Sequence, residues 1–161
     1  MLLDWTLVTG PEVLAAITAR LVATERERMS DSTALGQALL EGGRLLGRAP
    51  PCWRQVLDIS GDGKNNDGAD PDMLDGDPAL AGVTVNALVI GADDRSPGDI
   101  RAVDIGELSS YFHAHVIRGP GAFVQVALGF ADYERAMTRK LLRELEPAAM
   151  SALAPVPLPP G

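Results

Sequence analysis

Acidic and hydroxyl side chains gather where a buried strand is expected to end. Asp58, Ser60 and Asp62 alternate at the end of residues 55–60, whose composition predicts a strand. Alternate side chains of an extended chain lie on one face, so these oxygens would face the same way if the strand extends that far. Carboxylate and hydroxyl oxygens suit hard cations such as Mg²⁺. The spacing therefore indicates either a cation site or a solvated turn.

The acidic charge continues beyond this turn. Residues 58–77 contain seven aspartates and a single lysine, Lys64. The sequence from Asp58 does not match a calcium-binding EF-hand loop, because the twelfth position of that motif is Ala69 and not a bidentate glutamate. A Mg²⁺-dependent hydrolase or phosphotransferase using the acidic loop is an alternative. It lacks a convincing general base, a Gly-x-x-x-x-Gly-Lys phosphate loop and a Ser-His-Asp arrangement.

Length and composition limit the remaining classes. The 161 residues fit one domain, and 46% hydrophobic with 22% charged residues predicts a packed core. A formal net charge of −8 argues against binding a nucleic-acid backbone. We find no apolar run of the roughly 20 residues that cross a membrane, and no targeting segment at the start. Localisation is open: exported or periplasmic if a signal lies upstream, and cytoplasmic otherwise.

Apolar periodicity and turn residues divide the chain into alternating elements. Strands are predicted at residues 2–8, 55–60, 83–90 and 122–127. Helices are predicted at 11–24, 34–47, 73–80 (broken), 105–116 and 130–145. Residues 91–104 are expected to be a polar surface insertion, and 147–161 a proline-rich disordered tail after a domain of residues 1–146.

The order of these elements predicts an α/β fold. Strands that alternate with helices form a largely parallel sheet with helices on both faces. Ligands of such sheets bind beyond the carboxyl ends of the strands, where Asp62 is expected. Asn86, polar within a strand that is otherwise apolar, is expected to satisfy a neighbouring backbone group.

Three segments together resemble a known family. They are Ser32-Thr33-Ala34-Leu35-Gly36, then Asp58-Ile59-Ser60-Gly61-Asp62-Gly63 followed by Asn65-Asn66, and Arg118-Gly119-Pro120-Gly121-Ala122-Phe123. At these positions the chain resembles a bacterial family of von Willebrand factor type A-like (vWA-like) proteins of unknown function. The resemblance runs from about Trp5 to Glu146, and it implies a three-layer, Rossmann-like sheet with helices on both faces.

The resemblance also implies a function. A metal-ion-dependent adhesion site combines an Asp-x-Ser-x-Ser motif, a threonine and an aspartate, and Thr33 and Asp62 match the last two. An open position on Mg²⁺ would accept an acidic side chain of a protein partner, without catalysis. Thr33 as a helix N-cap and Asp62 as a turn former are the structural alternatives. The family usually has two glycines where this chain has Asp31-Ser32.

One part of the family pattern is not found. No Asp-x-Ser-x-Ser lies upstream of Thr33, and the chain opens at what resembles the third strand, without the first strand, first helix and second strand. A misplaced start, a non-functional remnant and completion by another chain are the alternatives, and we favour the first. Mg²⁺ binding should then be weak or absent. An exposed sheet edge beside residues 55–60 should lower stability or cause self-association.

Overall fold

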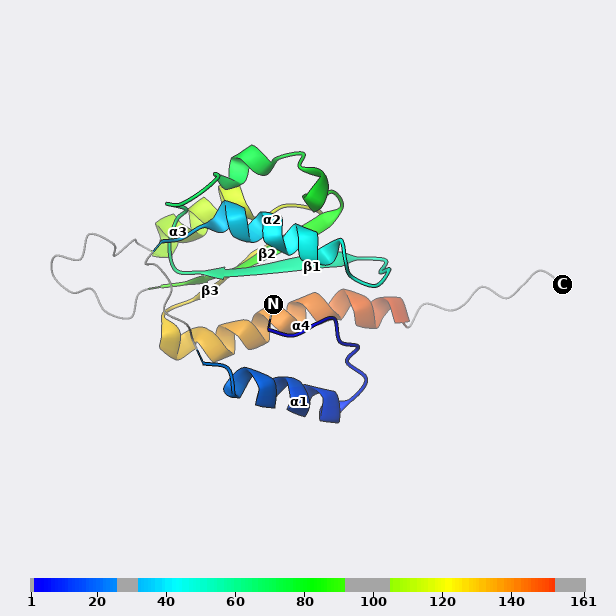
Figure 1. Ribbon diagram of the computed structural model, residues 1–161. Helices are drawn as coiled ribbons and strands as arrows, with labels where there is room; N and C mark the ends of the chain where they lie inside the picture. Colours follow the sequence, from blue (N-terminus) through cyan, green and yellow to red (C-terminus); the bar gives the residue numbers. More distant parts are fainter. Residues whose placement is uncertain (1, 26–31, 92–104, 153–161) are drawn as a thin grey trace.

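Three parallel strands and four α-helices, with short 3₁₀ turns at Pro71–Leu74, Pro78–Leu80 and Phe130–Asp132, form the described part of the protein, shown in Figure 1. The computed structural model describes residues 2–25, 32–91 and 105–152. The helices are α1 (Pro11–Val22), α2 (Leu35–Leu46), α3 (Ile105–Tyr111), which a π-helical turn (Phe112–Val116) continues, and α4 (Tyr133–Ala152). The strands are β1 (Gln55–Gly61), β2 (Val83–Ile90) and β3 (Val124–Ala127).

The sheet has the order β1-β2-β3, with β2 in the middle. Both pairings are parallel, with Gln55 opposite Val83 and Ala87 opposite Val124. All eight residues of β2 are buried, as its uninterrupted apolar sequence predicts for a strand covered on both faces. The predicted α/β class with a parallel sheet is confirmed, and the bounds of β2 are those predicted.

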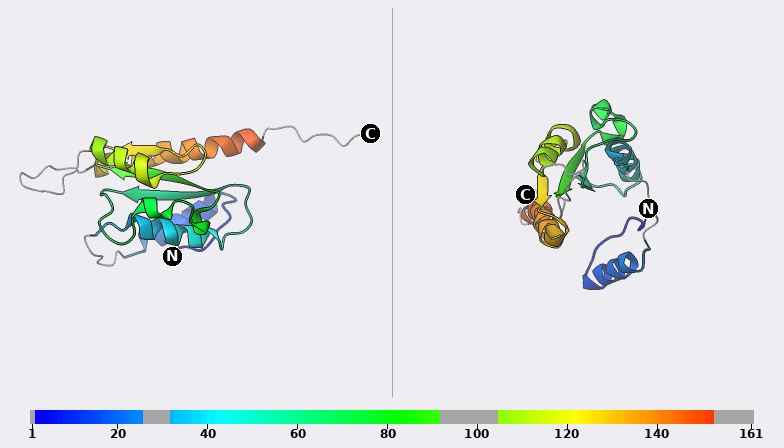
Figure 2. Two further views of the ribbon diagram at one scale, coloured as in Figure 1. Left: turned by 90° about the horizontal axis from the view of Figure 1, so that it is seen from above. Right: turned by 90° about the vertical axis from the view of Figure 1, so that its left-hand side faces the viewer.

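Helices lie on both faces of this sheet (Figures 1 and 2). The larger core lies on the side of α2 and α3, where Leu39, Val85 and Phe112 have no exposed surface. A smaller core joins Leu88 of β2 to Ala136 of α4 on the other face. Within the described ranges, no helix is long and apolar enough to cross a membrane.

The predicted strand at residues 2–8 is wrong. The segment has no regular secondary structure, and no strand lies beside it in the described part of the chain. Local hydrogen bonds replace a ladder: the Trp5 amide donates to Asp4 Oδ1 and the Thr6 hydroxyl donates to the Asp4 carbonyl. A β-rich composition does not form a strand without a partner for its backbone groups.

Helix α4 differs from its prediction in length and in its buried face. It continues beyond Leu145 to Ala152, while residues 153–161 of the predicted tail lie outside the described residues. Helical spacing predicts one apolar stripe along this helix, but two of its members, Leu141 and Leu145, are exposed. The predicted stripe comprises Phe130, Tyr133, Met137, Leu141 and Leu145. Lys140 is buried in place of these two leucines, because it pairs with Asp58 of β1 and with Glu144 of the same helix. The predicted insertion at 91–104 lies, except for Gly91, outside the described residues.

Helix α1 contributes little to this core. None of its residues is buried, and Leu14, Leu21 and Val22 are each at least half exposed. Figure 2 shows α1 apart from the sheet and from α4. Its amphipathic sequence formed the predicted helix, but its apolar face is largely without a partner among the described residues.

Two glycines let the connection between β1 and β2 pass close to α2. A β-carbon at Gly36 would lie 2.0 Å from the carbonyl oxygen of Ala69, and one at Gly43 would lie 2.5 Å from that of Ala79. Backbone atoms at these distances cannot move aside as a flexible side chain could. Both helix-weakening glycines therefore have a packing role that helix propensity alone does not reveal.

Gly36→Ala should destabilise the protein. The intrinsic helix gain of alanine is about 1 kcal/mol, whereas forced overpacking costs about 1–3 kcal/mol and here strikes backbone. We expect a net loss of about 1–2 kcal/mol, measured by denaturant unfolding. Gly47→Ala is the control, because its φ is −62° and its nearest contact would be an ordinary 3.5 Å. Equal stability of the Gly36 variant and wild type would show that the connection can shift.

Candidate metal site at the carboxyl end of β1

The two predicted ligands lie on loops that are bound to each other. Thr33 precedes α2 and Asp62 follows β1. The Thr33 amide donates to Asn66 Oδ1 at 2.7 Å, and the Asn66 amide donates to the Thr33 carbonyl at 2.9 Å. A β-carbon at Gly63 would lie 2.9 Å from Thr33 Oγ1. The threonine hydroxyl therefore lies against the backbone of the residue that follows Asp62.

Asn65, and not Thr33, satisfies the first turn of α2. Its Oδ1 accepts from the amides of Leu35 at 2.7 Å and Gly36 at 3.4 Å, and its Nδ2 donates to the Ala69 carbonyl. The N-cap position of α2 has no side-chain hydrogen bond of its own. The interpretation of Thr33 as a helix N-cap is therefore wrong, and the turn after β1 supplies the cap from a distance.

Asp62 is exposed, and it makes no hydrogen bond or ion pair with the other described residues. The adjacent cation, Lys64, pairs with Glu107 and approaches the ring of Tyr111 at 5.8 Å. This arrangement leaves the Asp62 carboxylate open to solvent, one residue before the glycine that the Thr33 hydroxyl approaches. One carboxylate and one hydroxyl fit two positions of a Mg²⁺ shell, and water or a partner would supply the rest.

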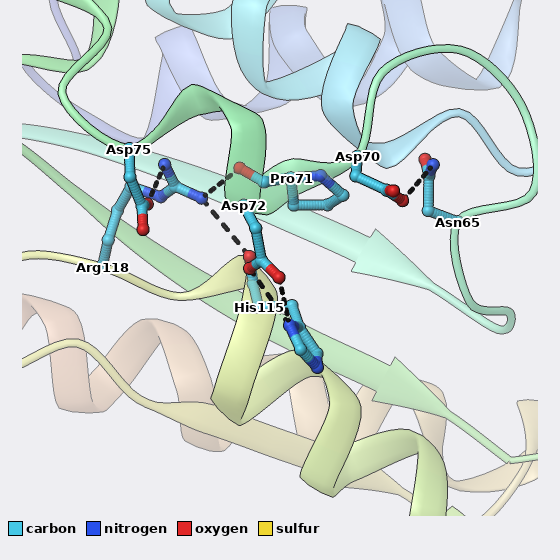
Figure 3. A network of polar contacts seen from close by, with 7 residues as sticks. All are labelled: Asn65, Asp70, Pro71, Asp72, Asp75, His115 and Arg118. Carbon is cyan, nitrogen blue, oxygen red and sulfur yellow. Dashed lines mark hydrogen bonds and ion pairs between the residues drawn. The ribbon is translucent and has the colours of Figure 1, made fainter.

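Three further carboxylates of the acidic segment have partners in the structure, as Figure 3 shows. Asp72 accepts from His115 Nδ1 at 2.8 Å, and Asp75 pairs with Arg118 at 3.3 Å. Asp70 accepts a 3.4 Å hydrogen bond from Asn65. Each of the three aspartates thus has a partner in the network that fastens this segment to the fold.

The order of the elements also predicts that residues 62–77 lie at the same end of the sheet as Thr33, and for most of this segment the prediction is wrong. Residue 69 lies at the start of α2 and residue 79 near its end, so the segment runs back along the helix toward the start of β2. A connection between parallel strands has to make this return. In the described ranges, no group of three or more His, Cys, Asp or Glu side chains is arranged to hold a metal ion.

A second polar cluster lies on the α4 face of the sheet. Lys140, only 1% exposed, donates to Asp58 of β1 and to Glu144 Oε1 at 2.7 Å. Asn86 Nδ2 donates to the same Glu144 oxygen at 2.8 Å, and Asn86 Oδ1 accepts from the Phe123 amide at 3.2 Å. The predicted role of Asn86 toward a backbone group is confirmed.

Sequence reasoning missed Lys140 and Glu144. Their spacing of four residues on a helix indicates an ion pair, but such pairs are usually solvated. Nothing in the spacing shows that Asp58, 82 residues away in sequence, would draw the lysine inward. Asp58 therefore points to the α4 face, and it does not join Asp62 in one site.

Two glycines of the segment 118–123, the third of those that resemble the vWA-like family, form a turn. Gly119 and Gly121 have φ values of 88° and 71°, which side chains other than glycine rarely adopt. A β-carbon on Gly119 would also lie 2.8 Å from the Val83 carbonyl oxygen. The turn delivers the Phe123 amide to Asn86, so this segment holds β3 against β2.

Asn65→Ala should destabilise the protein by about 1–2 kcal/mol, because it removes the acceptor for the first amides of α2. Denaturant unfolding measures the change. Asp67→Ala is a matched control in the same turn, since among the described residues Asp67 accepts an exposed hydrogen bond from Ser32 and no other. A similar loss in both variants would show that the turn as a whole, and not the cap, carries the effect.

The Asp58 cluster predicts a pH dependence. Burial raises the pKa of Asp58 above its ordinary value of 3.8; the hydrogen bond from Lys140 opposes this rise and Glu144 adds to it. The folded state therefore binds this proton more tightly, and stability falls as pH rises from 3.8 through the folded-state pKa. Asp58→Asn removes this titration. Its free energy of unfolding relative to wild type should increase as pH rises from 3.8 through the folded-state pKa of Asp58.

The pKa of Asp132 is shifted in the opposite direction to that of Asp58. The amide of Leu128 and the guanidinium of Arg135 donate to its carboxylate and lower its pKa. The stability that the ionised form contributes is present above 3.8 and lost as pH falls through the lower folded-state pKa. Asp132→Asn should therefore lose stability relative to wild type as pH rises toward 4. An Asp58→Asn variant with this same trend would show that attraction to Lys140 dominates over burial.

Comparisons with known proteins place the chain in a family. A comparison with curated proteins found no match, and a comparison with solved structures found none either. A family model described as "Protein of unknown function (DUF1194)" matches residues 1–149. Since this match covers most of the 161 residues, the chain belongs to the DUF1194 family of proteins of unknown function.

Proposed function

We propose that the protein is a metal-dependent protein-binding module of the vWA-like adhesion type. Thr33 and Asp62 are its own ligands for Mg²⁺. The metal would present an open position to an acidic side chain of a partner protein. In this proposal the protein recognises a partner and performs no catalysis.

The observation that carries the proposal is the pairing of the two loops. Asn66 joins its side chain and its amide to the backbone of Thr33, while the Thr33 hydroxyl lies against Gly63. The Thr33 hydroxyl is thus held near the carboxyl end of β1, where Asp62 follows the strand and where α/β sheets bind ligands. The asparagines fix the backbone, which leaves the two oxygen-bearing side chains for a cation.

Two protein ligands make a weak site. A Mg²⁺ shell is octahedral, so most positions would remain with water, and a single carboxylate neutralises only part of the charge. Affinity on the order of millimolar or poorer follows from that incomplete shell. A partner that adds a carboxylate to the same ion would therefore strengthen both interactions at once.

Titration with Mg²⁺ or Mn²⁺ tests the site. Mn²⁺ should broaden the amide resonances of residues 33 and 62–63 selectively, because its paramagnetism acts at short range. Asp62→Asn and Thr33→Val, which keep the side-chain shapes, should abolish or weaken this broadening. Asp67→Asn removes the same charge from the same turn and should leave the broadening unchanged. Micromolar binding that survives Asp62→Asn would place the ion elsewhere and contradict the proposal.

A phosphoester assay on the same Mg²⁺-loaded protein separates the alternatives. Turnover would favour the hydrolase or phosphotransferase, binding without turnover favours the module, and absence of both favours a non-functional remnant. The paired state of Asp70, Asp72 and Asp75 weakens the enzyme alternative, since these carboxylates have the partners described above.

A further inference from the structure

Lys64 is the one basic residue of the acidic segment 58–77, and it lies two residues after Asp62. Two residues of extended chain span at most about 7 Å, and a lysine side chain is long and flexible. An ammonium group at this position is therefore within reach of the Asp62 carboxylate. There it would compete with Mg²⁺ for the same oxygen atoms.

In the structure, α3 holds Lys64 instead. The ammonium group of Lys64 pairs with Glu107, and it lies 5.8 Å from the centre of the Tyr111 ring. Glu107 and Tyr111 are four residues apart on α3, so their side chains lie on the same face of the helix. The helix thus presents a carboxylate and an aromatic ring to one lysine, and both attract a cation.

Buried residues fix α3 beside the turn that carries Asp62. Leu108 is 1% exposed, and Phe112, in the π-helical turn that continues α3, has no exposed surface. A β-carbon at Gly61, the residue before Asp62, would lie 3.0 Å from the Phe112 ring. The element that holds Lys64 is therefore packed against the carboxyl end of β1.

The exposure of the ion pair sets the size of its effect. The side chain of Lys64 is 37% exposed and that of Glu107 is 62% exposed. Ion pairs at a protein surface are weak, because water and salt screen the charges. Loss of this pair should therefore change the occupancy of Asp62 severalfold and not by orders of magnitude.

We propose that Glu107 is a positioning residue that holds Lys64 away from Asp62 and so leaves that carboxylate to a divalent cation. This inference rests on the proposed function, and it adds the residue that keeps the metal site open. Glu107 acts through Lys64 and does not itself bind the ion. Its removal should therefore weaken metal binding only while Lys64 is present.

A double-mutant cycle on Lys64 and Glu107 tests the proposal in the full chain. Broadening of the amide resonances of residues 62–63 during titration with Mn²⁺ gives the affinity of each variant. Glu107→Gln should bind about threefold more weakly than wild type, because the released ammonium group competes at Asp62. Lys64→Met should bind at least as tightly as wild type, and adding it to Glu107→Gln should restore wild-type affinity. Asp67→Asn is the control, because it removes a charge from the same turn without releasing the lysine.

The metal-free protein provides a second readout. In the presence of Lys64, Glu107→Gln should shift the amide resonances of residues 62–63, because the ammonium group then pairs with Asp62. In the Lys64→Met background, the same substitution should leave these resonances unchanged. This comparison needs no bound ion, so it is separate from the test of the metal site itself.

Three outcomes would overturn the proposal. They are equal Mn²⁺ affinity of Glu107→Gln and wild type, an equal loss in Asp67→Asn, and a loss in Lys64→Met as large as that in Glu107→Gln. The last would show that the pair only tethers the turn to α3. Absence of Mn²⁺ broadening in wild type would instead contradict the proposed function, and the metal-free resonances would still decide whether Glu107 keeps Lys64 from Asp62.

Discussion

The complete burial of β2 is the constraint on which the rest of the structure depends. Its eight residues have no face toward solvent, so both faces need cover and both edges need a partner strand. β1 and β3 satisfy the edges in parallel, and each parallel pairing requires a connection that returns along the sheet. The acidic segment is one such connection. Its aspartates fix it to the turn after β1, to the π-helical turn that follows α3 and to Arg118 before β3, which explains why most of them are unavailable to a metal.

The turn after β1 concentrates several tasks in few residues. Asn65 caps α2, Asn66 binds the backbone of Thr33, and Gly63 allows the threonine hydroxyl to approach. These contacts use side-chain amides and backbone, and they leave the carboxylate of Asp62 unengaged among the described residues. The chemistry available at this end of the sheet is therefore that of a weak oxygen site, and its strength would depend on what a partner adds.

The α4 face of the sheet contains a buried charge, Lys140, whereas Asp62 in the turn after β1 is exposed. A lysine as deeply buried as Lys140 is stable only with partners, and Asp58 and Glu144 are those partners. Glu144 is itself held by a hydrogen bond from Asn86. The cluster ties the edge strand to α4 across the middle of the sheet.

The sequence by itself determined the α/β class, the buried strand at residues 83–90 and the succession of helices, because apolar periodicity depends on neighbours along the chain. It also identified the turn that carries Asp62. Only the tertiary structure decided that residues 2–8 form no strand, that Lys140 replaces Leu141 on the buried face, and that Asn65 caps α2. Each of these outcomes depends on a partner distant in sequence or on the lack of a neighbouring strand, and local propensity does not encode either.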